Sequence, residues 1–164
     1  MQRKRMTRIL FEAVPPLWRH ILLLWPIVML PAVVIGGLAQ LVAFALGVRA
    51  QSFGAAPGDG WASSLQSILF APLVETLLLF LLIEISRKAG LSRLAIAVLS
   101  GVVAGSLHAI VAPLWFFTSA WAFFVYGCAY LAWRPSSIQK ALCAAALLHA
   151  LNNATTVALL LLIA

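Results

Sequence analysis

Long apolar stretches alternate with short polar ones along this chain. A helix needs roughly 20 apolar residues to cross a hydrocarbon core about 30 Å thick. Five stretches are of about this length: one within residues 21–48, followed by residues 64–85, 94–111, 113–133 and 141–164. The pattern therefore predicts an all-α fold, a polytopic membrane helical bundle of about five transmembrane helices that occupies residues 21–164.

The polar breaks between these stretches predict an orientation. Residues 1–20 form a basic segment, residues 86–93 contain three basic side chains and residues 134–140 contain two, whereas Arg49 alone is basic on the other side. Because basic residues accumulate in cytoplasmic loops, we predict a cytoplasmic N-terminus and a multi-pass protein of the cell (inner) membrane. The amphipathic segment 1–20 is expected to lie along the cytoplasmic interface, and residues 21–48 to form an uncleaved first helix.

Composition excludes a soluble domain. Hydrophobic residues make up 64% of the 164 residues and charged residues only 9%, whereas soluble domains average roughly 45–50% apolar and about 25% charged. The net charge of +7 is concentrated in the short loops. Such loops favour contact with an anionic membrane face, so we expect the lipid bilayer, and not nucleic acid, as the partner of these charges.

A few ionisable or strongly polar side chains fall inside the apolar stretches. They are Glu75, His108, His149 and Asn153. At 1.5 Å per helical residue, counted from the nearest cytoplasmic charges, they lie about 18, 22, 14 and 20 Å deep. Three helices thus place costly groups in one slab of roughly 8 Å, which favours a functional site.

Local spacing supports the same grouping. His149 and Asn153 are separated by four residues and therefore share a helix face. Gly101 and Gly105 form a G-x-x-x-G pattern on the face of His108, where small residues allow close approach of another helix. Ala71 lies one turn before Glu75, and Pro72 is expected to open the local helical hydrogen bonding.

Other interpretations exist for single residues. A transmembrane His can bond a neighbouring carbonyl and an Asn can join two helices, so matched depth, more than any one residue, indicates a site. Glu84 lies on roughly the opposite face from Glu75 and is expected to pair with Arg87 or Lys88. Cys128 and Cys143 are expected to act as small hydrophobic residues.

The spacing of these residues resembles the CPBP family of CAAX proteases and bacteriocin-processing (Abi) enzymes. The family motif E-E-x-x-x-R aligns with residues 75–80, F-x-x-x-H with residues 104–108, and H-x-x-x-N with residues 149–153. The resemblance covers residues 64–156, the expected catalytic core. Glu75, His108, His149 and Asn153 are kept, while Thr76, Phe80 and Ala104 replace the second Glu, the Arg and the Phe of the motifs.

The resemblance implies a metal-free, glutamate-dependent intramembrane endopeptidase acting on a membrane-associated protein or peptide, with C-terminal processing or sorting of anchored proteins as one form of the reaction. The residues permit this chemistry. A carboxylate in an apolar environment can act as a general base near neutral pH, so Glu75 with His108 would activate water. His149 and Asn153, one turn apart, would donate to the developing oxyanion.

Three alternatives use the same residues differently. Glu75, His108 and His149 could form a catalytic zinc set, although the chain has no H-E-x-x-H pattern and no cofactor is expected. A catalytically degenerate relative could act as a bacteriocin-immunity or scaffolding membrane protein. His108 and His149 could also serve as axial haem ligands, which would leave Glu75 and Asn153 unexplained.

Overall fold

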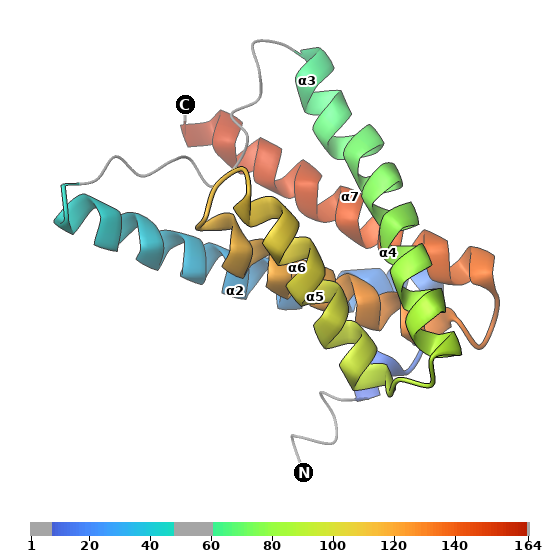
Figure 1. The fold of residues 1–164 in the computed structure, drawn as a ribbon. Helices are drawn as coiled ribbons and strands as arrows, with labels where there is room; N and C mark the ends of the chain where they lie inside the picture. The colour runs from blue at the N-terminus through green and yellow to red at the C-terminus, as the bar shows by residue number, and fades with distance from the viewer. Residues whose placement is uncertain (1–7, 48–60, 164) are drawn as a thin grey trace.

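The computed structural model describes residues 8–47 and 61–163, and within these ranges it contains helices and no strands. The predicted all-α class is confirmed. The predicted loop 49–60, Arg49 and the first seven residues lie outside the described ranges. Figure 1 shows the helices, which are α2 (Leu17–Ala45), α3 (Trp61–Leu65), the π-helical η1 (Gln66–Phe70), α4 (Ala71–Lys88), α5 (Arg93–Ala109), α6 (Trp115–Trp133) and α7 (Ile138–Ile163).

The helices have the lengths that a membrane protein requires. Four spans among the described residues are long and apolar enough to cross a bilayer: Leu17–Leu38, Ala62–Lys88, Trp115–Trp133 and Ile138–Leu159. The fifth predicted span corresponds to α5, an apolar helix of 17 residues with a length of about 26 Å. The chain is therefore a polytopic membrane bundle. Because α2 begins at Leu17, the last residues of the predicted 1–20 segment belong to this helix.

Helix α6 occupies the centre of the bundle. It packs against α2, α4, α5 and α7, and nearly every residue from Ala122 to Trp133 is buried. A helix that is apolar on all sides can be covered in this way, because no face needs contact with water. Its large aromatic side chains fill the space between the outer helices, and Tyr126 and Tyr130 are among the largest fully buried residues.

The G-x-x-x-G pattern of α5 allows another helix to approach closely, as its spacing predicts, and that helix is α6. A Cβ atom on Gly105 would lie 2.8 Å from the Phe116 carbonyl oxygen, and one on Gly101 would overlap the Ala120 carbonyl oxygen. Any larger side chain would push the two backbones apart. The glycines therefore set the close packing of α5 on α6.

The two turns that carry basic residues lie at the same end of the bundle. Gly90, with φ of +80°, ends α4, and the Leu91 and Gly90 N–H groups donate to the Ser86 and Arg87 carbonyls. This left-handed closure suits glycine, which has no Cβ. At the other turn, the Ser137 hydroxyl accepts a hydrogen bond from the Lys140 N–H. Figure 1 shows the N-terminal part of the chain near this end.

Side chains join these segments to one another. Arg93 donates to the Leu131 carbonyl at 2.7 Å and to the Phe11 carbonyl. Glu84 accepts hydrogen bonds from Arg87, Tyr130 and Arg134. The expected structural role of Glu84 is confirmed, with two partners that helix spacing did not reveal. Hydrogen bonding to this carboxylate raises the pKa of the Arg134 guanidinium, so this pair keeps its charge.

Candidate functional site

Glu75 lies between two of the predicted site histidines. Its Oε2 atom is 3.8 Å from His108 Nε2 and 3.7 Å from His149 Nε2. The three residues come from three helices, α4, α5 and α7, which correspond to three different apolar stretches of the sequence. The side chains of Glu75 and His108 are 30% and 28% exposed, and that of His149 is 5% exposed. The structure therefore brings these residues together, with Glu75 and His108 partly exposed and His149 buried.

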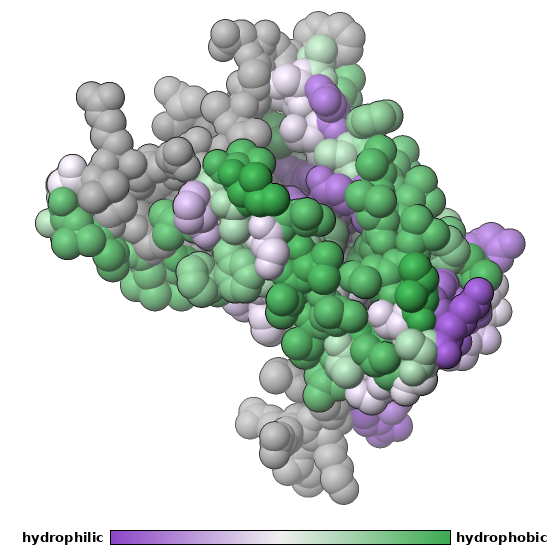
Figure 2. Space-filling view, viewed as in Figure 1, coloured by the Kyte–Doolittle hydropathy of each residue, from purple (hydrophilic) through white to green (hydrophobic). Residues whose placement is uncertain are grey.

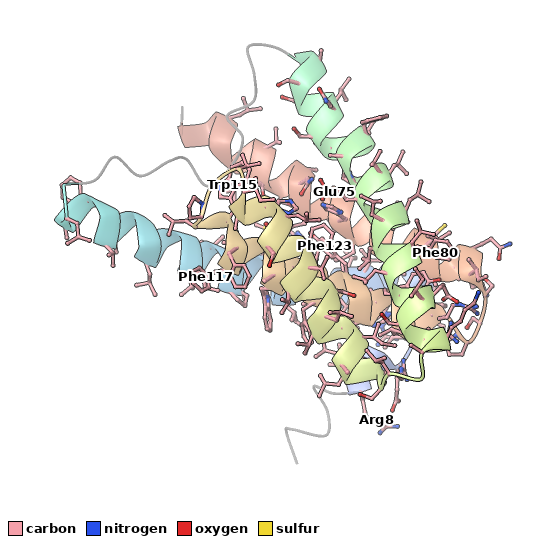
Figure 3. All side chains as sticks on the ribbon, in the orientation of Figure 1. Arg8, Glu75, Phe80, Trp115, Phe117 and Phe123 are labelled. Atoms are coloured by element: carbon pink, nitrogen blue, oxygen red, sulfur yellow. The ribbon has the colours of Figure 1, made fainter. Side chains whose placement is uncertain are left out.

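The position of this cluster can be followed in two views. Figure 3 labels Glu75 on the side of α4 that faces α7. In Figure 2 the surface of the helices is mostly hydrophobic, with a small hydrophilic area in the same place. A larger hydrophilic area lies at the end of α4, where the basic turns are. The cluster around Glu75 is thus a polar area framed by apolar surface.

A backbone contact orients His108. Its Nδ1 atom lies 2.8 Å from the Ala104 carbonyl oxygen, one turn earlier in α5. A carbonyl only accepts, so Nδ1 carries the proton and donates. In the neutral ring, Nε2 then has a free electron pair directed to the side of Glu75. His108 can therefore accept a proton of a water molecule that also contacts the Glu75 carboxylate.

Aromatic rings hold His149. Tyr126 stacks on its ring with centroids 4.5 Å apart, and Phe123 meets its ring edge at 5.3 Å. Phe123 also contacts the His108 ring at 5.6 Å. His149 Nδ1 is buried and finds no hydrogen-bond partner among the described residues. Packing, and not hydrogen bonding, fixes this imidazole, and Nε2 is the nitrogen turned to Glu75.

Asn153 has a partner that the sequence did not indicate. Its Nδ2 atom donates to the Ser67 carbonyl oxygen at 2.9 Å, joining α7 to η1. The Ala71 N–H donates to the Gln66 carbonyl, five residues earlier, and Pro72 has no N–H to offer. Neither residue therefore donates a hydrogen bond to the Ser67 carbonyl, and the Asn153 amide donates one instead. The predicted opening of the helix near Pro72 is confirmed as this π-helical turn.

The geometry leaves the predicted role of Asn153 untested. One amide N–H is used on Ser67, and the second remains for another acceptor. The neighbouring Asn152 has a buried side-chain oxygen without a partner in the part of the chain that the structure describes. Asn153 thus joins α7 to η1, and its part in oxyanion binding stays a prediction.

Sequence reasoning missed Tyr126 and Phe123, which form the wall of the site. The Tyr126 hydroxyl is buried and has no hydrogen-bond partner among the described residues. Both residues belong to the aromatic α6, where so many rings occur that spacing singles out none. Only the packing of α6 against α7 distinguishes them.

The structure also bears on the metal alternative and on the cysteines. Within residues 8–47 and 61–163, no group of three or more His, Cys, Asp or Glu side chains has the arrangement of a metal site. A ligating His usually donates its second nitrogen to a partner, which His149 Nδ1 does not have among these residues. Cys128 is buried and Cys143 is exposed, and both are free thiols.

Comparisons with protein-family models, curated proteins and solved structures found no match. The resemblance to the CPBP family therefore rests on the motif residues themselves, and membership stays a prediction.

Proposed function

We propose that this chain is an intramembrane endopeptidase that uses Glu75 as its general base. The observation that carries the proposal is the approach of one Glu75 oxygen to within 3.8 Å of both imidazoles. These groups come from three helices of an apolar bundle, where each costs free energy to place. A cluster of this composition supports water activation better than it supports helix packing, since no direct hydrogen bond joins its members.

The proposed reaction begins with a water molecule held by Glu75 and His108. Both present acceptors, so the two water protons point to them and the oxygen lone pair faces the substrate carbonyl. The water oxygen attacks the carbonyl carbon, and Glu75 takes the proton. The same proton then passes to the amide nitrogen as the C–N bond breaks, which leaves an amine and a carboxylic acid that keeps the second water proton until it ionises in water.

His149 and Asn153 have the complementary role in this proposal. The His149 Nε2–H and the second Asn153 N–H would donate to the oxygen that becomes negative in the tetrahedral intermediate, a contribution of roughly 3–4 kcal/mol per donor in comparable sites. Tyr126 is a positioning residue, because its ring supports the His149 ring. A membrane-associated protein is the substrate class that fits a site placed within apolar spans, and C-terminal processing of anchored proteins is one such reaction.

The test uses Glu75→Gln, which keeps shape and hydrogen bonding but removes the proton acceptor. Membrane fractions from cells carrying the parent or the variant are compared by mass spectrometry of new protein termini. At least one new terminus should depend on the parent chain, and its formation should fall by about a hundredfold in the variant. Glu12→Gln removes an exposed carboxylate paired with Arg8 and serves as the control, with cleavage unchanged.

Two outcomes would contradict the proposal. If Glu75→Gln cleaves as well as the parent, Glu75 is not the base. If a chelator abolishes cleavage by the purified protein and zinc restores it, the zinc mechanism replaces the metal-free one. Membrane insertion and protein amount are measured for each variant.

A further inference from the structure

A cavity lies at the basic end of the bundle, away from Glu75. It has a volume of about 270 Å³, and its lining includes Arg87 at the end of α4, Arg93 at the start of α5 and Arg134 after α6. Leu91, Ile96 and Leu131 supply apolar lining. Three guanidinium groups from three segments thus meet around one space that also has an apolar wall.

The charges around this cavity do not cancel. Glu84 forms ion pairs with Arg87 at 2.8 Å and with Arg134 at 2.8 Å. Arg93 forms no ion pair with any carboxylate among the described residues, and it donates hydrogen bonds to two backbone carbonyls. One carboxylate therefore faces three guanidinium groups, which leaves an excess of two positive charges. A site with this excess attracts an anion.

The arginines are already held in place. Arg134 donates through Nε and Nη2 to the two oxygens of Glu84. Arg93 is fixed by the Leu131 carbonyl and lies over the Phe11 ring, 5.4 Å from its centroid. Each guanidinium has five N–H donors, and these contacts use only some of them. Little side-chain entropy would be lost on binding, and donors remain for ligand oxygens.

The position of the cavity indicates the chemistry of its ligand. Arg87, Arg93 and Arg134 belong to the turns predicted to face the cytoplasm, directly beside the apolar spans. Basic pockets between helices at such an interface suit anionic lipid headgroups. We propose that this cavity binds the phosphate of an anionic membrane phospholipid, with the guanidinium groups on the phosphate and the leucine and isoleucine side chains on the glycerol and first acyl carbons.

The test measures lipid binding to the full chain in detergent micelles by native mass spectrometry. Equal amounts of phosphatidylglycerol and phosphatidylcholine are added, and inorganic phosphate is titrated separately. The parent should retain phosphatidylglycerol in preference to phosphatidylcholine. Arg87→Gln and Arg93→Gln should each lower this affinity about fivefold, equivalent to about 1 kcal/mol for one basic residue at the surface. Lys140→Gln removes the same charge outside the cavity and should change it little.

Each alternative result is decisive. No preference for phosphatidylglycerol, or an equal loss in Lys140→Gln, would overturn the site in favour of general surface charge. Displacement of the lipid by inorganic phosphate at the same concentration would overturn the lipid as ligand and leave a free-phosphate site. Arg93 also holds Phe11 and Leu131, so circular dichroism is used to check its variant. If that variant unfolds, Arg87→Gln decides the result, because Glu84 keeps Arg134 and Tyr130 as partners.

Discussion

Helix α4 carries two glutamates whose surroundings differ completely. Glu84 accepts hydrogen bonds from Arg87, Tyr130 and Arg134, so both of its oxygens are occupied. Glu75, nine residues earlier, lies 3.7 and 3.8 Å from two imidazoles and forms no recognised hydrogen bond with the described residues. These separations are longer than a hydrogen bond. The first carboxylate is held by the fold, whereas the second keeps its capacity to accept protons.

The histidines repeat this difference. His20 is buried and uses both ring nitrogens: Trp133 donates to Nδ1 at 2.7 Å, and Nε2 donates to the Ile9 carbonyl at 2.8 Å. His149 is equally buried, yet its Nδ1 has no partner among the described residues. Buried polar groups in proteins are normally satisfied. The contrast therefore separates groups that stabilise the bundle from groups that remain available for chemistry.

The largest expected effect comes from removing the imidazoles beside Glu75. His149→Ala and His108→Ala should each lower cleavage about 10²- to 10³-fold, because an oxyanion donor or a water-holding group is lost. His20→Ala should lower thermal stability but leave cleavage per folded molecule unchanged. Cleavage by each variant, normalised to folded protein, tests the comparison. Equal losses of activity in all three variants would show that the contrast between the histidines has no functional meaning.

Glu84→Gln should have the next largest effect, on stability. Hydrogen bonds to a charged group are worth about 1.5–3 kcal/mol, and Arg134 and Arg87 would lose their only carboxylate partner among the described residues. The midpoint of thermal unfolding should fall, whereas cleavage per folded molecule should stay at the level of the parent. Lys88→Gln, on the same turn but outside the Glu84 contacts, is the control. If Glu84→Gln keeps its stability and loses cleavage, Glu84 takes part in catalysis and the assignment of that role to Glu75 is wrong.

Asn153→Ala should destabilise the contact between α7 and η1. The partly buried Ser67 carbonyl would lose its donor, and leaving a buried polar group unsatisfied costs about 1–3 kcal/mol, so the loss here should lie toward the lower end of that range. Unfolding measured by circular dichroism should show this loss, and Asn153→Gln should not restore the bond because its side chain is longer. If cleavage falls much further than stability does, Asn153 also binds the oxyanion, as its spacing from His149 predicts.

Tyr126→Phe should have the smallest effect on stability. The hydroxyl that it removes has no partner among the described residues, so its loss costs little, and the stacked ring stays. The free energy of unfolding should change by less than about 0.5 kcal/mol. Cleavage by the same sample then separates two roles of Tyr126. Activity equal to that of the parent restricts it to supporting the His149 ring, and a marked loss gives its hydroxyl a part in the reaction.

The sequence predicts the parts of the molecule that depend on one helix at a time. Span positions follow from apolar length, and the grouping of Glu75, His108 and His149 followed from depth. The individual hydrogen bonds between side chains of different helices did not follow from the sequence. The bond from Arg134 to Glu84 joins residues 50 positions apart, and the donor for Ser67 depends on how α7 meets a π-helical turn. Spacing within a helix carries no information about which face of another helix it meets.

The two glycines of α5 also limit how the protein can move. Because a Cβ at either position would meet the α6 backbone or side chains, α5 and α6 have no space to slide or rotate past one another. His108, Phe123 and Tyr126 then keep a fixed arrangement, and because Phe123 and Tyr126 also pack on His149 of α7, α4, with exposed leucines along its outer face, is the helix expected to move. A disulfide between α5 and α6 should leave substrate entry intact, whereas one between α4 and α7 should block it. The route by which a peptide reaches Glu75 from the lipid would then be the seam between α4 and its neighbours.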